Sequence, residues 1–309
     1  MDLMINLPNS TDGIVQFIND ISNKGITLSK GTLINWENEL KNNLSNDIKI
    51  IEEKLLCSYY INHDESQIKI NGNNYNVLCA CNKEYVRLWG SKYKSMEAID
   101  EIGFLPKFKG VIVKDGTELY NKYGLILAQC ISHIQRYLKG IYDEINHKSP
   151  RKLSIFFTKC NDKRNEYIEN KIERFSEEEL LNITNEYDNI INEWDKELRN
   201  DLNNHMFKEE LNLFTRLKYD NKQMDPKIRG DRDEVLYFLK DFNVPSTNND
   251  AESSQRGVKI KQKIGKFRGE EGANNYLIIK SCILTYKKQK LDILDSIKQV
   301  FEGQTILGI

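Results

Sequence analysis

The stretch between Pro150 and Phe242 carries helical periodicity and no strand pattern, which predicts a long helical block inside the chain. Ser176 and Glu179 have the spacing of a capping box, and apolar residues then recur at helical intervals as far as Leu198. The residues before this block alternate short β-rich runs with helical ones. A chain with this order of elements is typical of the α/β class with a helical insertion.

The part before the helical block predicts a sheet of five strands. Asn71-Gly72 is a strong hairpin turn between the first two strands. A helix that Ser95 caps and Gly103 closes separates the third strand from the fourth. A short helix lies between the last two strands and another helix follows, so the order is β-β-β-α-β-α-β-α. The predicted strands span residues 67–70, 75–81, 85–89, 108–113 and 125–130.

These patterns divide the chain into four predicted regions. In the first of them, an apolar stripe from Ile14 to Ile21 and a second helical run after Gly25 have the spacing of a helix-turn-helix. Any helical hairpin has this spacing, so DNA contact and plain packing both remain open. The regions are 1–56 (helical), 57–148 (first part of the α/β core), 149–244 (helical block) and 245–309 (second part of the core with C-terminal helices).

The overall charge is nearly balanced, with 45 Lys and Arg against 46 Asp and Glu and a formal net charge of −1. Such a balance argues against a nucleic-acid partner, because binding to a polyanion uses a surplus of basic residues. The balance is a cancellation, however. Residues 256–290 contain ten basic and two acidic residues, whereas acidic residues outnumber basic ones in 161–201. This uneven distribution of charge along the chain has two explanations. The basic part forms a region that faces an anion, or both parts are ordinary helical surfaces in solvent.

The six cysteines lack the even, close spacing of a secreted disulfide framework, which favours reduced thiols in a cytosolic protein. No apolar stretch approaches the roughly 20 residues that cross a bilayer. The N-terminal residues also lack the basic head of a signal peptide. We therefore expect a cytoplasmic protein without a membrane partner.

Three acidic residues stand out by their position. Asp64 lies at the entry of the first predicted strand, just before residues 67–70, Asp115 ends the fourth, and Glu252 lies in the first turn of a helix after the helical block. In this layout the first and fourth strands are neighbours, so the carboxylates are expected to converge at one edge. Carboxylate oxygens suit Mg²⁺ or Mn²⁺, and two such ions promote displacement at phosphorus. Three unrelated surface acids are the alternative.

The helix that carries Glu252 also carries a row of cations. Arg256, Lys259 and Lys263 follow at intervals of four, seven and eleven residues, so they share a face with Glu252. A metal-binding carboxylate beside phosphate-binding cations suits phosphoryl transfer on a nucleic acid. Glu252 with Arg256 is equally consistent with an ordinary i,i+4 ion pair.

Four segments resemble motifs of DDE transposases of the insertion-sequence sixty-six family, in the family's order. Residues 248–256 (NNDAESSQR) with 267–273 (FRGEEGA) resemble the C-terminal signature, which supplies the last catalytic acid and an Arg four residues on. Asp64-Glu65-Ser66 resembles the segment of the first acid, and Asp115-Gly116 with Tyr120 that of the second. Residues 130–137 (CISHIQRY) resemble the family's Cys-x-x-His-x-x-Arg-aromatic motif.

The resemblance implies an RNase H-like fold with a large all-helical insertion before the last catalytic helix. It implies a DNA transposase that acts on transposon ends and target DNA as a homo-oligomer, with accessory transposition proteins possible, near the nucleoid of a bacterium or archaeon. Asp64, Asp115 and Glu252 would be the catalytic acids and the ligands of two Mg²⁺ or Mn²⁺ ions. The residues expected to hold DNA are Arg256, Lys259, Lys263, Arg268, His133 and Arg136.

The chain departs from the family pattern at several places. Family members generally carry a longer DNA-binding region before the catalytic part, so this chain is expected to be a fragment, a degenerate copy or one partner of a set. Ser66 replaces a Thr, Ile131 an aromatic residue and Lys290 a Gly.

Two functional alternatives stay open, a non-catalytic DNA-binding or assembly protein derived from a transposase, and an RNase H-like nuclease without strand transfer. Cys130 and His133 have the spacing of half a zinc site, but no second pair at suitable spacing follows. A structural or DNA-side role is therefore the expectation for this pair.

Overall fold

The computed structural model describes residues 10–23, 25–200, 208–219 and 230–308. The strands form one five-stranded mixed sheet in the order β3-β2-β1-β4-β5, which confirms the predicted α/β class and the number of strands. The chain divides into two compact units. The first unit holds the chain up to Gly110 together with Leu119–Leu125 and the part from Asn249 onward, and the second holds Val111–Glu118 and Ile126–Asn248.

The first unit contains an antiparallel meander of three strands, β1 (Tyr60–Ile70), β2 (Asn73–Cys81) and β3 (Val86–Ser91). The predicted hairpin turn joins β1 to β2. Both of its residues have positive φ, 49° at Asn71 and 85° at Gly72, as the two-residue turn that matches the strand twist requires.

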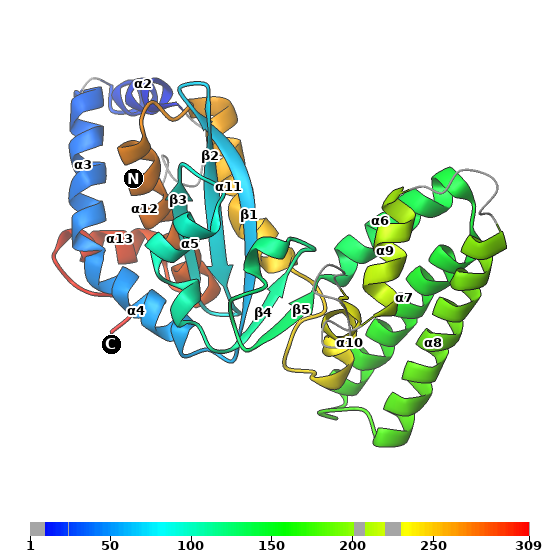
Figure 1. The fold of residues 1–309 in the computed structure, drawn as a ribbon. Coiled ribbons are helices and arrows are strands. Elements are labelled where there is room, and N and C mark those ends of the chain that lie inside the picture. The colour runs from blue at the N-terminus through cyan, green and yellow to red at the C-terminus, as the bar shows by residue number, and fades with distance from the viewer. Residues whose placement is uncertain (1–9, 24, 201–207, 220–229, 309) are drawn as a thin grey trace. The chain divides into compact units, whose positions relative to one another are not determined.

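Helices cover the meander in two layers. α11 (Asn249–Gly265) packs against β1 and β2, and α12 (Glu270–Lys288) packs against β3. The outer helices α3, α4 and α13 contact α12 or one another (Figure 1). The outer and short elements are α3 (Lys30–Asn43), α4 (Ser45–Leu56), α5 (Met96–Ile102), α13 (Ile293–Phe301) and the 3-10 turns Leu105–Lys107 and Glu118–Tyr120.

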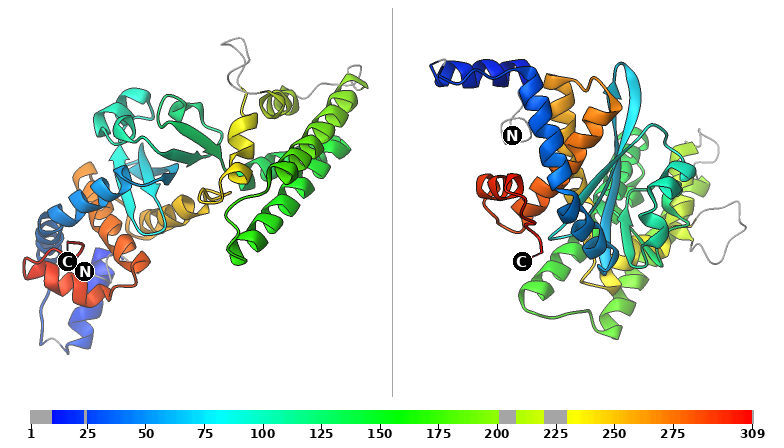
Figure 2. Two further views of the ribbon diagram at one scale, coloured as in Figure 1. Left: turned by 90° about the horizontal axis from the view of Figure 1, so that it is seen from below. Right: turned by 90° about the vertical axis from the view of Figure 1, so that its left-hand side faces the viewer.

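The N-terminal helix α2 (Thr11–Ile21) buries less of its apolar stripe than the sequence predicts. Ile14 is buried, whereas Phe17 is 51% and Ile21 67% exposed. The reason is that α2 packs against α3, not against the sheet, and Figure 2 shows it extending away from the sheet. Residues 22–29 separate α2 from α3, a longer link than the three to four residues of a typical helix-turn-helix.

Lys290, which stands where the family pattern has Gly, follows the end of α12 with φ at 59°. This is the left-handed conformation that glycine adopts most readily after a helix. The backbone N–H of Leu291 donates to the carbonyl of Tyr286 and closes the helix. The turn therefore forms in this chain with a lysine in the glycine position.

The second unit joins two parallel strands, β4 (Val111–Lys114) and β5 (Ile126–Gln129), to a helical block. The predicted capping box is present, because the Glu179 N–H donates to Ser176 Oγ and the Ser176 N–H donates to Glu179 Oε2. Within the described part of 150–242 there is no strand, as predicted. The helices are α6 (Ile131–Ile145), α7 (Lys148–Glu169), α8 (Glu177–Asn200), α9 (Lys208–Lys218) and α10 (Arg232–Lys240).

One cluster of apolar side chains fills the second unit. Trp194 and Tyr187 of α8 are fully buried in it, together with Phe157 of α7 and Leu217 of α9. None of the helices in the described part of the chain combines the length and hydropathy that crossing a membrane requires.

Candidate active site and nucleic-acid interface

Asp64 lies inside β1, not at the start of the strand as the sequence predicts. β1 begins at Tyr60, so the polar run His63-Asp64-Glu65 is part of the ladder, and Asp64 pairs with Cys79 of β2. These polar residues are weak strand formers on their own, and pairing with the buried β2 overrides that preference. The Asp64 side chain is half-buried.

The helix that carries Glu252 is attached to the strand that carries Asp64. Gln255, one turn after Glu252, is buried, and its Nε2 donates to the backbone carbonyl of Asp64 over 2.9 Å. The same nitrogen lies 3.4 Å from the carbonyl of Val77 on β2. Because Ala251 and Val258 are also buried against the sheet, the first turn of α11 has a fixed position on β1.

The side chains next to Asp64 form a linked group within the first unit. Glu65 Oε2 accepts a hydrogen bond from the Tyr120 hydroxyl over 2.9 Å, and Glu65 Oε1 lies 3.4 Å from Lys94 Nζ. The ring of His63 meets the ring of Tyr120 edge to face at 4.4 Å. Tyr120 thus contacts the strand that carries Asp64 on both sides of this residue.

Asp115 follows β4 directly, in the second unit. Its Oδ1 accepts from the backbone N–H of Thr117 over 2.9 Å. Burial alone would raise the pKa of Asp115, but hydrogen bonds from Thr117 and the charges of His133 and Lys114 outweigh burial and hold the pKa below its ordinary value. Asp115 is therefore ionised at neutral pH, the state that a cation-binding carboxylate needs.

Lys114, the last residue of β4, is fully buried in a polar network beneath Asp115. Its Nζ lies 3.5 Å from Glu234 Oε2 and donates to the carbonyl of Thr117 over 3.3 Å. Gln129 of β5 donates to the same Glu234 oxygen over 3.1 Å. Since Thr117 also binds Asp115, this network holds the turn after β4 in one conformation.

The segment from Cys130 to His133 has two structural roles in the second unit. The buried Cys130 sulfur accepts a hydrogen bond from the backbone N–H of Asn248 over 3.1 Å, and Ile131 N–H donates to the carbonyl of Ser246 over 2.9 Å. These contacts fix the residues that lead into α11. His133, one turn into α6, lies close enough for its charge to lower the pKa of Asp115.

The described residues contain no group of three or more His, Cys, Asp or Glu side chains that could hold a metal ion. Of the three predicted acids, Asp64 and Glu252 belong to the first unit. Gln255, on the same helix as Glu252, joins this helix to the backbone of Asp64. Asp115 belongs to the second unit.

The predicted cationic face of α11 is exposed to solvent. Arg256, Lys259 and Lys263 all project outward and form no ion pair with another described residue. Arg256 therefore does not form the i,i+4 ion pair with Glu252 that the sequence also allows. Arg136 on α6 and Arg268 after α11 are exposed as well.

A sequence comparison identifies the family of the chain. The family model described as "Transposase IS66 family" matches residues 15–275, which is most of the chain. The chain belongs to this family of transposases. A comparison with curated proteins found no match. Membership makes DNA the partner of this transposase.

Three contacts of this IS66-family chain were not foreseen from the sequence, namely Gln255 to Asp64, Tyr120 to Glu65, and Cys130 to Asn248. All three join segments that the family motifs mark, so the motifs signalled their importance without their role. For Gln255 the signal is its place in the segment 248–256, one turn after Glu252.

Proposed function

We propose that this transposase catalyses DNA strand cleavage and strand transfer, with Asp64, Asp115 and Glu252 as the catalytic acids of an RNase H-like core. The observation that carries the proposal is the match to the transposase family together with the positions of the three acids on β1, directly after β4 and in the first turn of α11. In the family that the sequence resembles, the three acids of a DDE site come from segments in these positions.

Two Mg²⁺ or Mn²⁺ ions fit the donor set, because carboxylate oxygens are the ligands that hard divalent cations prefer. The lowered pKa of Asp115 supports this fit, since the carboxylate is charged without a metal. When bound, such ions activate the attacking oxygen and stabilise the leaving oxygen.

The proposed chemistry has two displacements at phosphorus. In the first, a water oxygen bonds to phosphorus and gives up a proton, the bond from phosphorus to the 3′ oxygen of the transposon strand breaks, and that oxygen takes up a proton and becomes a free hydroxyl. In the second, this 3′ hydroxyl loses its proton as its oxygen bonds to a phosphorus of the target, and the target's own 3′ oxygen leaves and takes up a proton. The exposed Arg256, Lys259 and Lys263 hold the strand by its phosphates.

Cleavage and joining of DNA by the purified chain test this function. An end-labelled duplex that carries the transposon end, incubated with plasmid target and Mg²⁺, is expected to give a cut strand and then a strand joined to the plasmid. Chelation of the metal should stop both reactions. A cut strand that never joins identifies a nuclease, and DNA binding without cutting identifies a non-catalytic binding protein; either result contradicts the proposal.

The assembly of the transposase belongs to the same proposal. Strand transfer of two transposon ends needs two active sites held together, which supports a homo-oligomer on DNA and leaves room for accessory transposition proteins. Its place of action would be the bacterial or archaeal cytoplasm, at the nucleoid.

A further inference from the structure

A pocket of about 220 Å³ lies in the first unit, between the N-terminal helices and the turn that joins α11 to α12. It is smaller than the roughly 300–1,000 Å³ of pockets that enclose whole small molecules, so it suits one compact group. Three helices begin at its wall, α2 at Thr11, α3 at Lys30 and α12 after Gly269. Helix N-termini carry partial positive charge, which favours an anion. Ser10 and Ser29 already accept one N–H group each of α2 and α3, so the remaining N–H groups of these helices and those of α12 are the ones that face the pocket's contents.

The side chains of the pocket carry a surplus of positive charge. Each of its two acidic residues lies near a cation. Asp12 forms an ion pair with Lys30. Burial raises the pKa of Glu37, and the nearby charge of Lys261 acts in the opposite direction. Two more cations, Lys266 and Arg268, form no ion pair with a described residue. The pocket therefore has two cations in excess of its acids.

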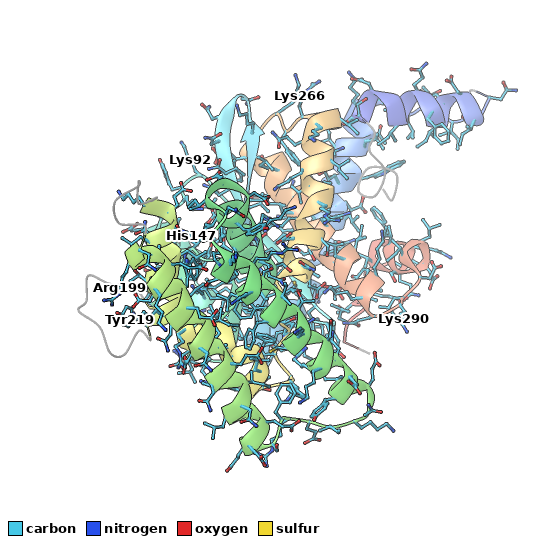
Figure 3. The ribbon with its side chains drawn as sticks, turned by 90° about the vertical axis from the view of Figure 1, so that its right-hand side faces the viewer. Lys92, His147, Arg199, Tyr219, Lys266 and Lys290 are labelled. Atoms are coloured by element: carbon cyan, nitrogen blue, oxygen red, sulfur yellow. The ribbon has the colours of Figure 1, made fainter. Side chains whose placement is uncertain are left out.

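The turn that carries these two cations is held in place by the β1–β2 hairpin. Phe267 forms a backbone bridge with Ile70 and packs edge to face on Tyr276, at 5.5 Å between ring centroids. Asn71 Nδ2 donates to the carbonyl of Arg268 over 2.7 Å. Phe267 is buried while its two neighbours remain exposed, and Figure 3 shows Lys266 at this turn. The two cations are thus presented from a fixed backbone.

The pocket continues the cationic row of α11. Arg256, Lys259 and Lys263 lead along the helix from Glu252 toward Lys266. At about 1.5 Å per residue, residue 266 lies about 21 Å from residue 252 along the helix. Successive phosphates of one DNA strand are about 3.4 Å apart along the axis, so this distance corresponds to about six nucleotides.

We propose that this pocket binds a backbone phosphate of the substrate DNA, about six nucleotides from the bond that is cut. The inference rests on the proposed function, because Glu252 defines where cutting occurs. Bound there, the phosphate would fix the register of the strand over the row of cations without contributing to the chemical step.

Phosphate-ethylation interference tests the pocket directly. We compare wild type, the double variant Lys266→Ala/Arg268→Ala, and a control with the same charge change at exposed side chains away from the pocket, Lys54→Ala/Lys83→Ala. Wild type and control should show interference at a phosphate about six nucleotides from the cut, and the double variant should lose it. The slope of log affinity against log salt should weaken by about 0.9 for one lost phosphate contact.

The possible failures are distinguishable. If the double variant and wild type share one interference pattern and one salt slope, the pocket does not hold a DNA phosphate, and the proposed function stands. If wild type neither binds nor cuts the duplex, the proposed function fails and the pocket fails with it. If inorganic phosphate raises the melting temperature of wild type but not of the double variant while DNA binding is unchanged, the pocket binds free phosphate and the proposal is wrong.

Discussion

Replacing Asp115 with Asn is expected to slow Mg²⁺-dependent strand cleavage by roughly a thousandfold or more and to leave the protein folded. Asn keeps an oxygen that can accept the hydrogen bond from the Thr117 N–H, so the turn after β4 retains its anchor. What it loses is the negative charge, which the lowered pKa of Asp115 shows to be present at neutral pH. A metal supplies several kcal/mol of charge stabilisation in such reactions, and each 1.36 kcal/mol is tenfold in rate.

Asp143→Asn is the matched control for this variant, because Asp143 is an exposed acid of the same unit, on α6. It should cleave like wild type. Circular dichroism and the melting temperature establish whether Asp115→Asn is folded. A folded Asp115→Asn protein that cuts as fast as the control would remove Asp115 from the active site.

Replacing Gln255 with Leu is expected to lower the turnover rate by roughly a hundredfold, although Gln255 is not expected to touch the DNA. Its Nε2 holds the backbone of Asp64 at 2.9 Å, one turn from Glu252. Without this hydrogen bond the position of Glu252 relative to Asp64 is less fixed. A displacement of about 1 Å between reacting groups can lower the rate a hundredfold. The lost hydrogen bond itself costs only about 0.5–1.5 kcal/mol of stability.

Gln262→Leu makes the same chemical change two turns further along α11 and serves as the control. A positioning role predicts a lower kcat with an unchanged KM for DNA in Gln255→Leu, and a weaker affinity for Mn²⁺. A merely structural role predicts a lower melting temperature with both kinetic constants unchanged after correction for the folded fraction. The second pattern would refute the positioning role.

Signals that depend on neighbouring residues predicted the local structure well. Ser95 caps α5 as predicted, and Ser29 and Asp292 cap α3 and α13 in the same way. The hairpin at Asn71-Gly72 also forms as expected, because positive φ at both positions suits these two residue types. Each of these features is decided within a few residues, so the sequence carries the whole cause.

Contacts between distant segments could not be predicted in the same way. Gln255 and Asp64 are far apart in the chain, and the two motif segments in which they lie do not indicate that they touch. The sequence predicts a start of β1 that is several residues later than the observed one at Tyr60. The reason is that His63, Asp64 and Glu65 have the composition of a loop, and only their pairing with β2 makes them part of a strand. The three acids were singled out by their places in the predicted layout and by the family motifs, which record a tertiary arrangement that composition and periodicity do not encode.

Counting bound Mn²⁺ by electron paramagnetic resonance tests the central claim most directly, namely that Asp64, Asp115 and Glu252 are the ligands of two metal ions. Wild type should bind two ions, while Asp64→Asn, Asp115→Asn and Glu252→Gln should each lose at least one ion or bind it far more weakly; the control Asp143→Asn should match wild type. If Asp115→Asn binds Mn²⁺ as wild type does, with the same number of ions and the same affinity, Asp115 is not a metal ligand and the account is contradicted.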